Sequence, residues 1–296
     1  MHEKYLRQLP KSSSKRKLTD RLVGFAAIAC IVIVLIPLVS IIYEVVIRGG
    51  QVINWQFLTD IPRGFNTEIN GGLGPSIQGT LVLIGLASLV SVPVGILTGI
   101  YLSEFAGNGR FPSSVRLIND ILAGMPSIVI GFLAFLTLVL VMGRYSTIAG
   151  AFALSIIMIP IVVRVTEESL RLIPMTVREA GHALGVQKWK VSMFVVLMAA
   201  KKGVLTGIVL GIARIAGETA PLLLTIGGTR SFFSGFDASV DAIPVRIFQY
   251  AKSPFDPANA AAWGGALILI VLVLILSVAL RLIVEGKSFG TKSHTL

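Results

Sequence analysis

Six long apolar runs divide the chain, and each is close to the roughly 20 residues that a helix needs to cross about 30 Å of hydrocarbon. The runs are continuous and lack the alternation of a transmembrane β-strand, which favours helices over a barrel. The first run is about twice as long as the apolar part of a secretory signal, so we expect a membrane anchor. The pattern predicts an all-α integral membrane protein with six transmembrane helices. The runs cover residues 22–47, 77–101, 121–142, 147–163, 203–226 and 263–280.

Composition excludes a soluble globular domain. Of the 296 residues, 54% are hydrophobic and 14% are charged, whereas soluble domains carry about 25% charged residues. The single cysteine, Cys30, lies in the first apolar run. An intrachain disulfide and a cysteine-based zinc site are therefore both excluded.

The basic residues predict the orientation in the membrane. If the N-terminus is cytoplasmic, the inner segments hold 19 Lys and Arg and the outer segments hold six. Cytoplasmic loops carry the excess of basic residues in membrane proteins, so we expect a multi-pass protein with both termini in the cytoplasm. The expected organisation is a basic tail over 1–21, a transmembrane domain over 22–284 with an inner loop over 164–202, and a tail over 285–296.

Motifs for catalysis, metal binding or ATP binding do not emerge. The sequence has no HExxH or GxSxG motif, and its three histidines are far apart. The tripeptide 286–288 resembles the end of a phosphate-binding P-loop, but Arg281 stands where that motif needs glycine. The basic stretch 11–17 is interpreted as a solvated tail near anionic lipid, without a role in nucleic-acid binding. We expect no catalytic residue, metal or cofactor, and an energy source in a partner or an ion gradient.

Glycines at helical spacing predict close helix packing. Gly95 and Gly99 lie four residues apart in the second run, and three more glycines repeat this spacing in the fifth. Small residues four apart share one helix face and let backbones approach. The fifth run is therefore expected to be a packed, interior helix. Its glycines are Gly203, Gly207 and Gly211.

The outer segments 48–76 and 227–262 are rich in Gly, Pro, Asn and Asp, which predicts irregular loops or short surface helices. The second segment also carries four phenylalanines. These side chains either anchor in the membrane interface or meet an external partner. They are Phe232, Phe233, Phe236 and Phe248.

The inner loop over 164–202 is much longer than a simple connector. A short helix is expected after Pro174, with Glu179 near its start and a turn at Gly185. From the residues alone, this is an amphipathic helix on the membrane surface or a dock for a partner.

The same loop resembles the EAA loop of ABC-importer permeases, which reads Glu-Ala-Ala, three residues, Gly, nine residues and Ile-x-Leu-Pro. Glu179, Ala180 and Gly185 match, and Gly181 replaces the third small residue. Met198 stands where the family has proline. The resemblance implies a coupling helix that lies in a groove of an ATPase subunit, where small residues allow close approach.

A second stretch resembles one family of such permeases. Residues 213–221 read Ala-Arg-Ile-Ala-Gly-Glu-Thr-Ala-Pro, similar to a signature of the membrane subunits of Pst-type phosphate importers. Residues 124–132 also resemble that family, and the length fits the PstA type better than the PstC type.

This resemblance implies a type I ABC importer permease fold in a bacterial or archaeal plasma membrane. The implied function is half of a pathway for inorganic phosphate. The implied partners are a second, PstC-type permease, two PstB-type ATPase subunits and an external PstS-type phosphate-binding protein. A permease for another oxyanion, or a gradient-driven transporter or channel without an ATPase, remains the alternative.

Arg214 and Glu218 lie four residues apart within the fifth run, so a continuous helix would place them on one face. Charges at this depth face the protein interior or a wet cavity. They either neutralise each other and hold helices together, or line the pathway, with Arg214 binding phosphate and Glu218 holding it in place. Thr219 and Pro221 are expected beside them, with the proline bending the helix.

Overall fold

A computed structural model describes residues 14–63, 71–107 and 109–286, and most of these residues are helical. The chain divides into two units, Met1–Ile47 and Arg48–Leu296, and each is described by itself. Most of the predicted basic tail lies outside the described residues. So do residues 287–296 of the second tail, including the last two residues of the P-loop-like tripeptide.

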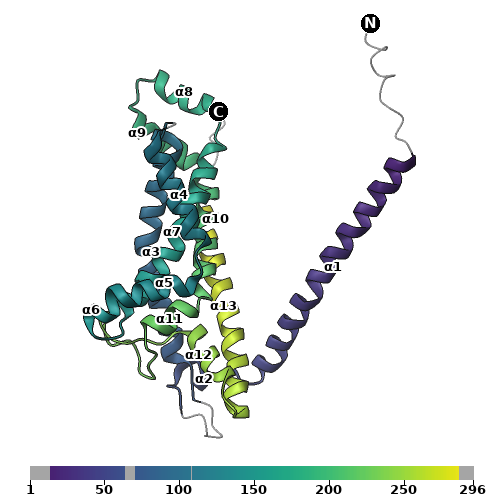
Figure 1. Ribbon diagram of the computed structural model, residues 1–296, viewed down its shortest axis with the longest axis vertical. Helices are drawn as coiled ribbons and strands as arrows, with labels where there is room; N and C mark the ends of the chain where they lie inside the picture. Colours follow the sequence, from purple (N-terminus) through teal and green to yellow (C-terminus); the bar gives the residue numbers. More distant parts are fainter. Residues whose placement is uncertain (1–13, 64–70, 108, 287–296) are drawn as a thin grey trace, which may run out of the picture. The chain divides into compact units, whose positions relative to one another are not determined.

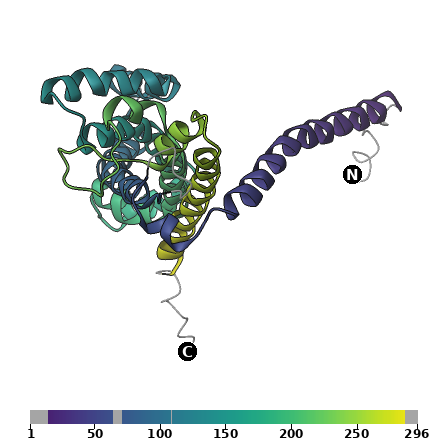
Figure 2. The same ribbon diagram turned by 90° about the horizontal axis from the view of Figure 1, so that it is seen from below.

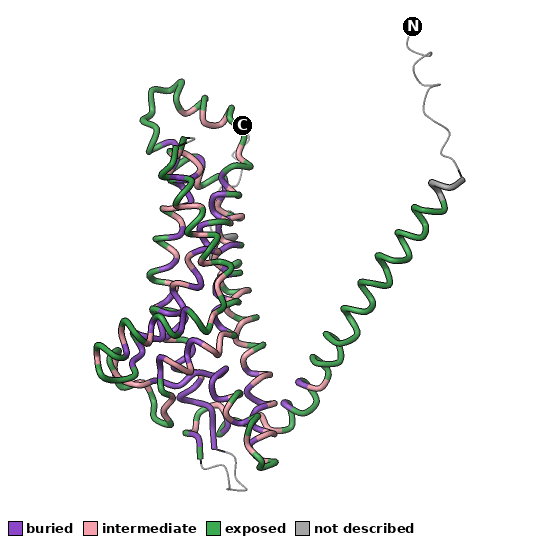
Figure 3. The backbone as a smooth tube through the Cα atoms, in the orientation of Figure 1, coloured by how far each residue is buried: buried purple, intermediate pink, exposed green. Residues whose placement is uncertain are grey.

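The first unit contains most of one long helix, α1 (Ser14–Gly50), which begins within the stretch expected to be a tail. Its residues are exposed from Leu18 to Tyr43, as Figure 3 shows in green, and only Val45 among its described apolar side chains is buried. Phe25 is 72% exposed and Ile33 is 67% exposed. A helix that is hydrophobic on all sides is stable only when lipid or protein surrounds it. Its composition and length fit a membrane span.

The second unit is an elongated helical bundle with two distinct ends (Figure 1). One end, which we call the α8 end, carries the short helices α8 (Met175–Ala183) and α9 (Lys188–Val191). The other end, the α12 end, carries α2 (Trp55–Thr59) and α12 (Ile243–Ala251). Long helices run between the two ends, so this unit has the form expected of a membrane domain.

Hydropathy along the described residues gives five helices able to span a membrane, or six if one bent pair counts as a single span. The six predicted spans are therefore confirmed when the bent pair is counted. The unbent ones in the second unit are α3 (Gly74–Ile100) with its continuation η2 (Tyr101–Phe105), α7 (Thr147–Arg171), the helix from α9 through η4 (Ser192–Val196) to α10 (Leu197–Ala216), and α13 (Asp256–Gly286).

The third span is bent, whereas the sequence pattern predicted one continuous helix over 121–142. Its first helix is α4 (Arg110–Gly124), and the helical structure is interrupted at Met125 and Pro126. The chain then continues as α5 (Ser127–Ala134), and the helix direction changes by 103° at this interruption. Because the residue before a proline is disfavoured in the α conformation, Pro126 ends the first helix. Figure 1 shows α5 lying across the bundle, where it continues through η3 (Phe135–Val139) into α6 (Leu140–Met142).

The core of the bundle lies around α7. Of its most apolar 18 residues 61% are buried, against 28% for the span containing α10, so α7 is the most buried of the spans. The fifth run, expected to be a packed, interior helix, packs against α7. The expected glycine packing is confirmed. A Cβ at Gly95 of α3 would lie 2.6 Å from Val162 of α7, and one at Gly207 of α10 would lie 2.7 Å from Val165.

The other helices border this core. In Figure 2, α13 (yellow) lies along one side of the bundle, where it packs against α10 and α12. Buried side chains of α3, α5, α7, α10 and α11 (Ala220–Thr225) form one apolar cluster, which contains Ile130, Met158 and Leu222. The bent third span and α11 are thereby fixed to the same core as the straight helices.

Candidate transport pathway and coupling site

The helix α8 occupies the position that the sequence predicted for a coupling helix. It begins after Pro174, and the chain turns at Gly185, whose φ of +71° belongs to the left-handed region that glycine adopts without strain. Glu179 lies in the middle of α8 rather than near its start. Glu179, Ala180 and Gly185 are all exposed, so these side chains are accessible to a partner.

Gly181 has a different environment. A Cβ at this position would lie 2.9 Å from Val191 of α9, so the missing side chain lets α8 pack against α9. Ala180 alone therefore supplies the small exposed surface that the resemblance implied for both positions. Met198 lies within α10, and the chain is helical from Lys188 to Ala216.

Large apolar side chains lie exposed around α8. Leu172 and Leu184 are more than four-fifths exposed, and Met175 and Trp189 are more than half exposed. Exposed apolar groups that lie together mark a surface for a protein partner or a membrane. Together with Glu179 and Ala180, they form a candidate coupling surface.

One arginine, Arg178, fastens α8 to the bundle. Its Nε and Nη2 donate to the two carboxylate oxygens of Glu104 in η2, at 3.0 and 2.6 Å. Its Nη2 also donates to the carbonyl oxygen of Leu170 at 2.9 Å, and its Nη1 donates to that of Ile173 at 2.5 Å. The hydrogen bonds with Glu104 raise the pKa of the Arg178 guanidinium, and burial only partly opposes this. The ion pair between Arg178 and Glu104, in which both side chains are mostly buried, therefore holds α8 against η2.

The predicted pathway residues lie at a break in the fifth span. The sequence pattern predicted a continuous helix over 203–226, but α10 ends at Ala216 and the chain resumes as α11 at Ala220. Gly217 caps α10, and Pro221 lies in the first turn of α11, where its missing N–H costs nothing. The helix is thus interrupted before the proline rather than bent at it.

The structure brings Arg214, in the last turn of α10, together with Glu218, which lies in this break. Nη2 of Arg214 lies 3.5 Å from Oε1 of Glu218; the arginine side chain is 52% exposed and the glutamate side chain is 14% exposed. Thr219 is partly buried and Pro221 is buried. A half-exposed guanidinium held by a nearly buried carboxylate can bind an anion on its free side.

The two broken spans meet beside these residues. Gly131 of α5 lies so close to α11 that a Cβ on it would be 2.5 Å from Cα of Pro221. Only a residue without a side chain allows this contact. The helix that follows the bend in the third span therefore packs directly against the helix that follows the break in the fifth.

A second buried ion pair, which sequence analysis missed, lies at the α12 end. Arg246 donates through Nε to Asp241 Oδ2 at 2.9 Å, and Ser76 of α3 donates to the same oxygen. Burial raises the pKa of the Asp241 carboxyl, although Arg246 and Ser76 favour its charged form. Arg246 also donates to the carbonyl oxygen of Thr229 at 2.9 Å. We call these residues the α12 latch, because they tie the segment before α12 to α3.

No group of His, Cys, Asp and Glu side chains in the described parts of the chain has the arrangement of a metal site. The candidate pathway residues are Arg214, Glu218, Thr219 and Pro221, and the candidate coupling surface is mostly apolar, with Glu179 as its carboxylate.

Comparisons with known proteins agree on the kind of protein. Residues 91–288 match the family described as binding-protein-dependent transport system inner membrane component. The phosphate transport system permease protein PstA of Haemophilus influenzae is 37% identical over 92% of this chain and 96% of its own length. The probable PstA of Methanocaldococcus jannaschii is 36% identical over 92% of this chain and 95% of its own length.

Solved structures show the same fold. The bacterial alginate ABC transporter, in complex with an alginate-bound periplasmic protein, contains a chain that matches with a TM-score of 0.60 at 16% identity. The match covers 94% of this chain and 98% of that one. A chain of the inward-facing methionine transporter MetNI matches with a TM-score of 0.58 at 19% identity, over 73% and 94%. The type I importer fold is confirmed, and the chain belongs to the binding-protein-dependent transport system inner membrane components, in the family of PstA-type permeases.

Proposed function

We propose that this chain forms half of the translocation pathway of an ATP-driven importer of inorganic phosphate. The observation that carries the proposal is its likeness, over about nine-tenths of its length, to permeases named for phosphate transport. As a membrane component of this family it is a transport subunit rather than an enzyme, and ATP is hydrolysed by a separate subunit. The cargo, the pathway residues and the individual partners are inferred.

Arg214 and Glu218 support phosphate as the cargo. A guanidinium offers planar, paired donors that fit two phosphate oxygens at once. Glu218 holds one side of this group and lowers the net charge, which weakens binding enough for the anion to leave. Thr219 and Pro221 border the same break, where the interrupted helix leaves backbone groups free to contact the anion.

The exposed surface of α8 supports docking to an ATPase. Glu179, Ala180 and Gly185 provide an acid, a small side chain and a turn on the outside of the bundle, with apolar residues around them. We infer two PstB-type ATPases, a PstC-type permease that completes the pathway, and an external PstS-type protein that delivers phosphate. The α8 end then faces the cytoplasm, and both termini lie on the same side.

Uptake of radiolabelled phosphate tests the cargo. Cells that carry this chain with its partners should take up phosphate, and excess sulfate or molybdate should not compete. If sulfate or molybdate competes fully, the chain serves another oxyanion. If uptake needs an ion gradient and no ATPase purifies with the chain, it is not an ABC permease subunit.

Paired substitutions test the pathway residues. Arg214→Gln should abolish uptake while the complex still assembles, because the donors for phosphate are lost. The double variant Arg214→Gln with Glu218→Leu removes both charges, so a pair that only holds the helices together should tolerate it better than the single change. Retained uptake in the double variant would refute the pathway role of Arg214.

Thiol labelling tests the orientation. In a chain whose Cys30 has been replaced, Asp237→Cys should react with an impermeant reagent from outside the cell, because Asp237 is more than half exposed near the α12 end. Gln187→Cys, beside α9, should react only after the membrane is opened. The reverse pattern would place the α8 end outside and overturn the proposed topology.

A further inference from the structure

The π-helical turn η2 joins the coupling helix to the bent third span. On one side, Arg178 of α8 holds Glu104 of η2. On the other, Arg116 of α4 donates through Nη2 to the carbonyl oxygen of Leu102 in η2, at 3.0 Å. The five-residue turn η2 is therefore hydrogen-bonded to one arginine of α8, through Glu104, and to one arginine of α4, through Leu102. π-helical turns occur often at functional sites.

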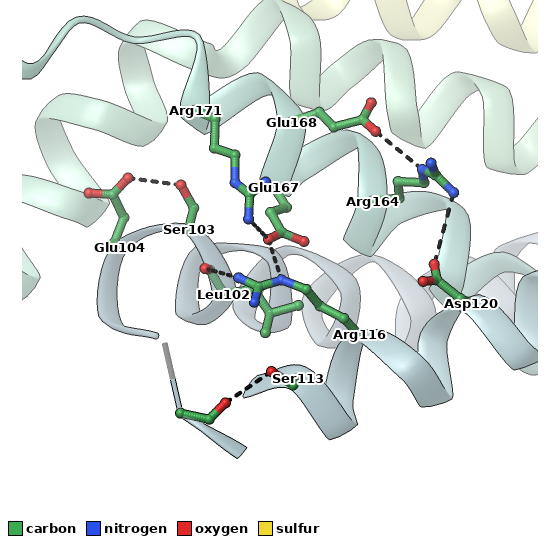
Figure 4. Close-up of polar contacts among 11 residues, drawn as sticks. Leu102, Ser103, Glu104, Ser113, Arg116, Asp120, Arg164, Glu167, Glu168 and Arg171 are labelled. Atoms are coloured by element: carbon green, nitrogen blue, oxygen red, sulfur yellow. Dashed lines mark hydrogen bonds and ion pairs between the residues drawn. The ribbon is translucent and has the colours of Figure 1, made fainter. Parts of the chain in front are cut away.

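Glu167 of α7 completes this arrangement (Figure 4). Its Oε1 accepts from Nε of Arg116 at 2.9 Å and from Nη2 of Arg171 at 2.5 Å. The glutamate side chain is only 11% exposed, whereas those of Arg116 and Arg171 are 34% and 57% exposed. A nearly buried carboxylate is thus shared by two cations that water can reach, so either arginine can move without leaving its charge unsolvated.

From Arg116 the connection continues along α4 to the pathway. Asn119, one turn further, donates to the carbonyl oxygen of Pro160 in α7 at 3.4 Å. The helix then ends at the 103° bend, and α5 follows. Through Gly131, α5 contacts Pro221, next to the break that contains Glu218, the partner of Arg214.

We propose that Glu104 and Glu167 are positioning residues, which transmit movement of α8 through η2 and α4 to the break beside Arg214. The inference rests on the proposed function, in which an ATPase moves α8. Neither carboxylate touches the cargo. Each fixes an arginine that joins two helices, so a displacement of α8 acts on α4 and then on α5 and α11. The helices α7 and α10, which pack closely along their glycines, serve as the fixed frame. Glu167 belongs to this frame, and its role is to hold Arg116 where η2 can act on α4.

The test uses the full complex in proteoliposomes and measures phosphate transported per ATP hydrolysed. Glu104→Gln and Glu167→Gln keep the shape of each side chain and remove its charge. We expect the complex to assemble and hydrolyse ATP, with the transport ratio lowered about tenfold, within the range of coupling between distant sites. A change that affected only stability would lower the amount of complex and leave this ratio unchanged.

Glu168→Gln is the matched control. Glu168 is the neighbour of Glu167 on α7, pairs with Arg164, and is 62% exposed. Its loss should leave the ratio as in the unmodified complex. If Glu104→Gln and Glu167→Gln also keep that ratio, the proposal is overturned.

Arg116→Gln provides a second test of the same connection. If a carboxylate variant does not accumulate, Arg116→Gln decides, because Glu167 keeps Arg171 as its partner in that variant. An unchanged ratio in Arg116→Gln overturns the proposal. If the unmodified complex carries another oxyanion, the proposed cargo fails, and the ratio is measured with that anion, which tests the transmission role separately.

Discussion

The two ends of the bundle are both held by ion pairs, but the pairs differ in their access to water. At the α12 latch, Asp241 is fully buried and the side chain of Arg246 is 5% exposed. At the α8 end, the arginines that hold Glu167 are one-third and more than half exposed. Removing a partner from a buried pair strands a charge away from water, whereas an exposed partner can be replaced by solvent.

This difference separates a fixed end from a movable one. Oδ2 of Asp241 accepts two hydrogen bonds, from Ser76 and from Nε of Arg246, and lies 2.8 Å from Nη2 of Arg246. Its other oxygen is buried with no hydrogen-bond partner in the described part of the chain. Such an arrangement is costly to disturb. At the α8 end the Arg178–Glu104 pair is also mostly buried, but Glu167 is shared by two arginines that water can reach, and these can exchange partners at low cost. Conformational change is therefore expected to enter at the α8 end and to leave the α12 latch intact.

The largest expected effect is that of Arg246→Met at the α12 latch. It leaves the buried carboxyl of Asp241 without its cation, which should destabilise the protein by about 3–5 kcal/mol. The measurement is thermal unfolding of the purified complex. Arg144→Met is the control, because Arg144 forms an exposed pair with Asp237 at 2.6 Å and should contribute about 0–1 kcal/mol.

The same variant should show a pH dependence of known sign. Burial already raises the pKa of Asp241, and the loss of Arg246 removes an interaction that opposes this. A carboxyl whose pKa is raised on folding stabilises the protein at low pH, and that contribution is lost as the pH rises through the raised pKa. The destabilisation should therefore be smaller in mildly acidic than in mildly alkaline buffer. The opposite trend would show that Asp241 is not the stranded group.

A medium effect is expected for Gly79→Ala, also beside the α12 latch. The added Cβ would lie 2.0 Å from the carbonyl oxygen of Asp241, so the backbone must move. Forced overpacking of this kind costs about 1–3 kcal/mol. Gly85→Ala, on the same helix, is the matched control, since no described atom outside its own helix lies within 4 Å of the added Cβ. Equal unfolding temperatures for the two variants would contradict tight packing at the latch.

The smallest effect is expected for Arg164→Gln at the α8 end. Nε of Arg164 lies 3.1 Å from Oε1 of Glu168, and its Nη1 lies 3.9 Å from Oδ1 of Asp120. All three side chains are more than three-fifths exposed. Exposed pairs contribute about 0–1 kcal/mol, and added salt screens them. Unfolding with and without high salt should differ little between this variant and the unmodified protein. If Arg164→Gln lowered the unfolding stability as much as Arg246→Met does, the two ends would not differ in how strongly their ion pairs stabilise the protein.

The spans and their glycine contacts were predictable because lipid imposes length and hydropathy, and close packing requires small residues. The bend before Ser127 had a signal in Pro126, but an unbroken apolar run concealed it. The spacing of Arg214 and Glu218 predicted their pairing, but the ion pairs between distant segments carried no such signal. Glu104 and Arg178 are 74 residues apart, and Arg116 and Glu167 are 51 apart, so only the assembled fold brings each pair together.

The π-helical turns have a consequence for insertions and deletions. In η2, the N–H of Ala106 donates to the carbonyl oxygen of Tyr101, five residues earlier, at 2.8 Å. Such a turn holds one residue more than an α-helical turn. Because this extra residue is contained within one turn, deleting one residue in η4 would restore the α-helical pattern and leave α10 facing nearly the same way. Deleting one residue from the regular part of α10 before Arg214 would instead rotate Arg214 by about 100° around the helix.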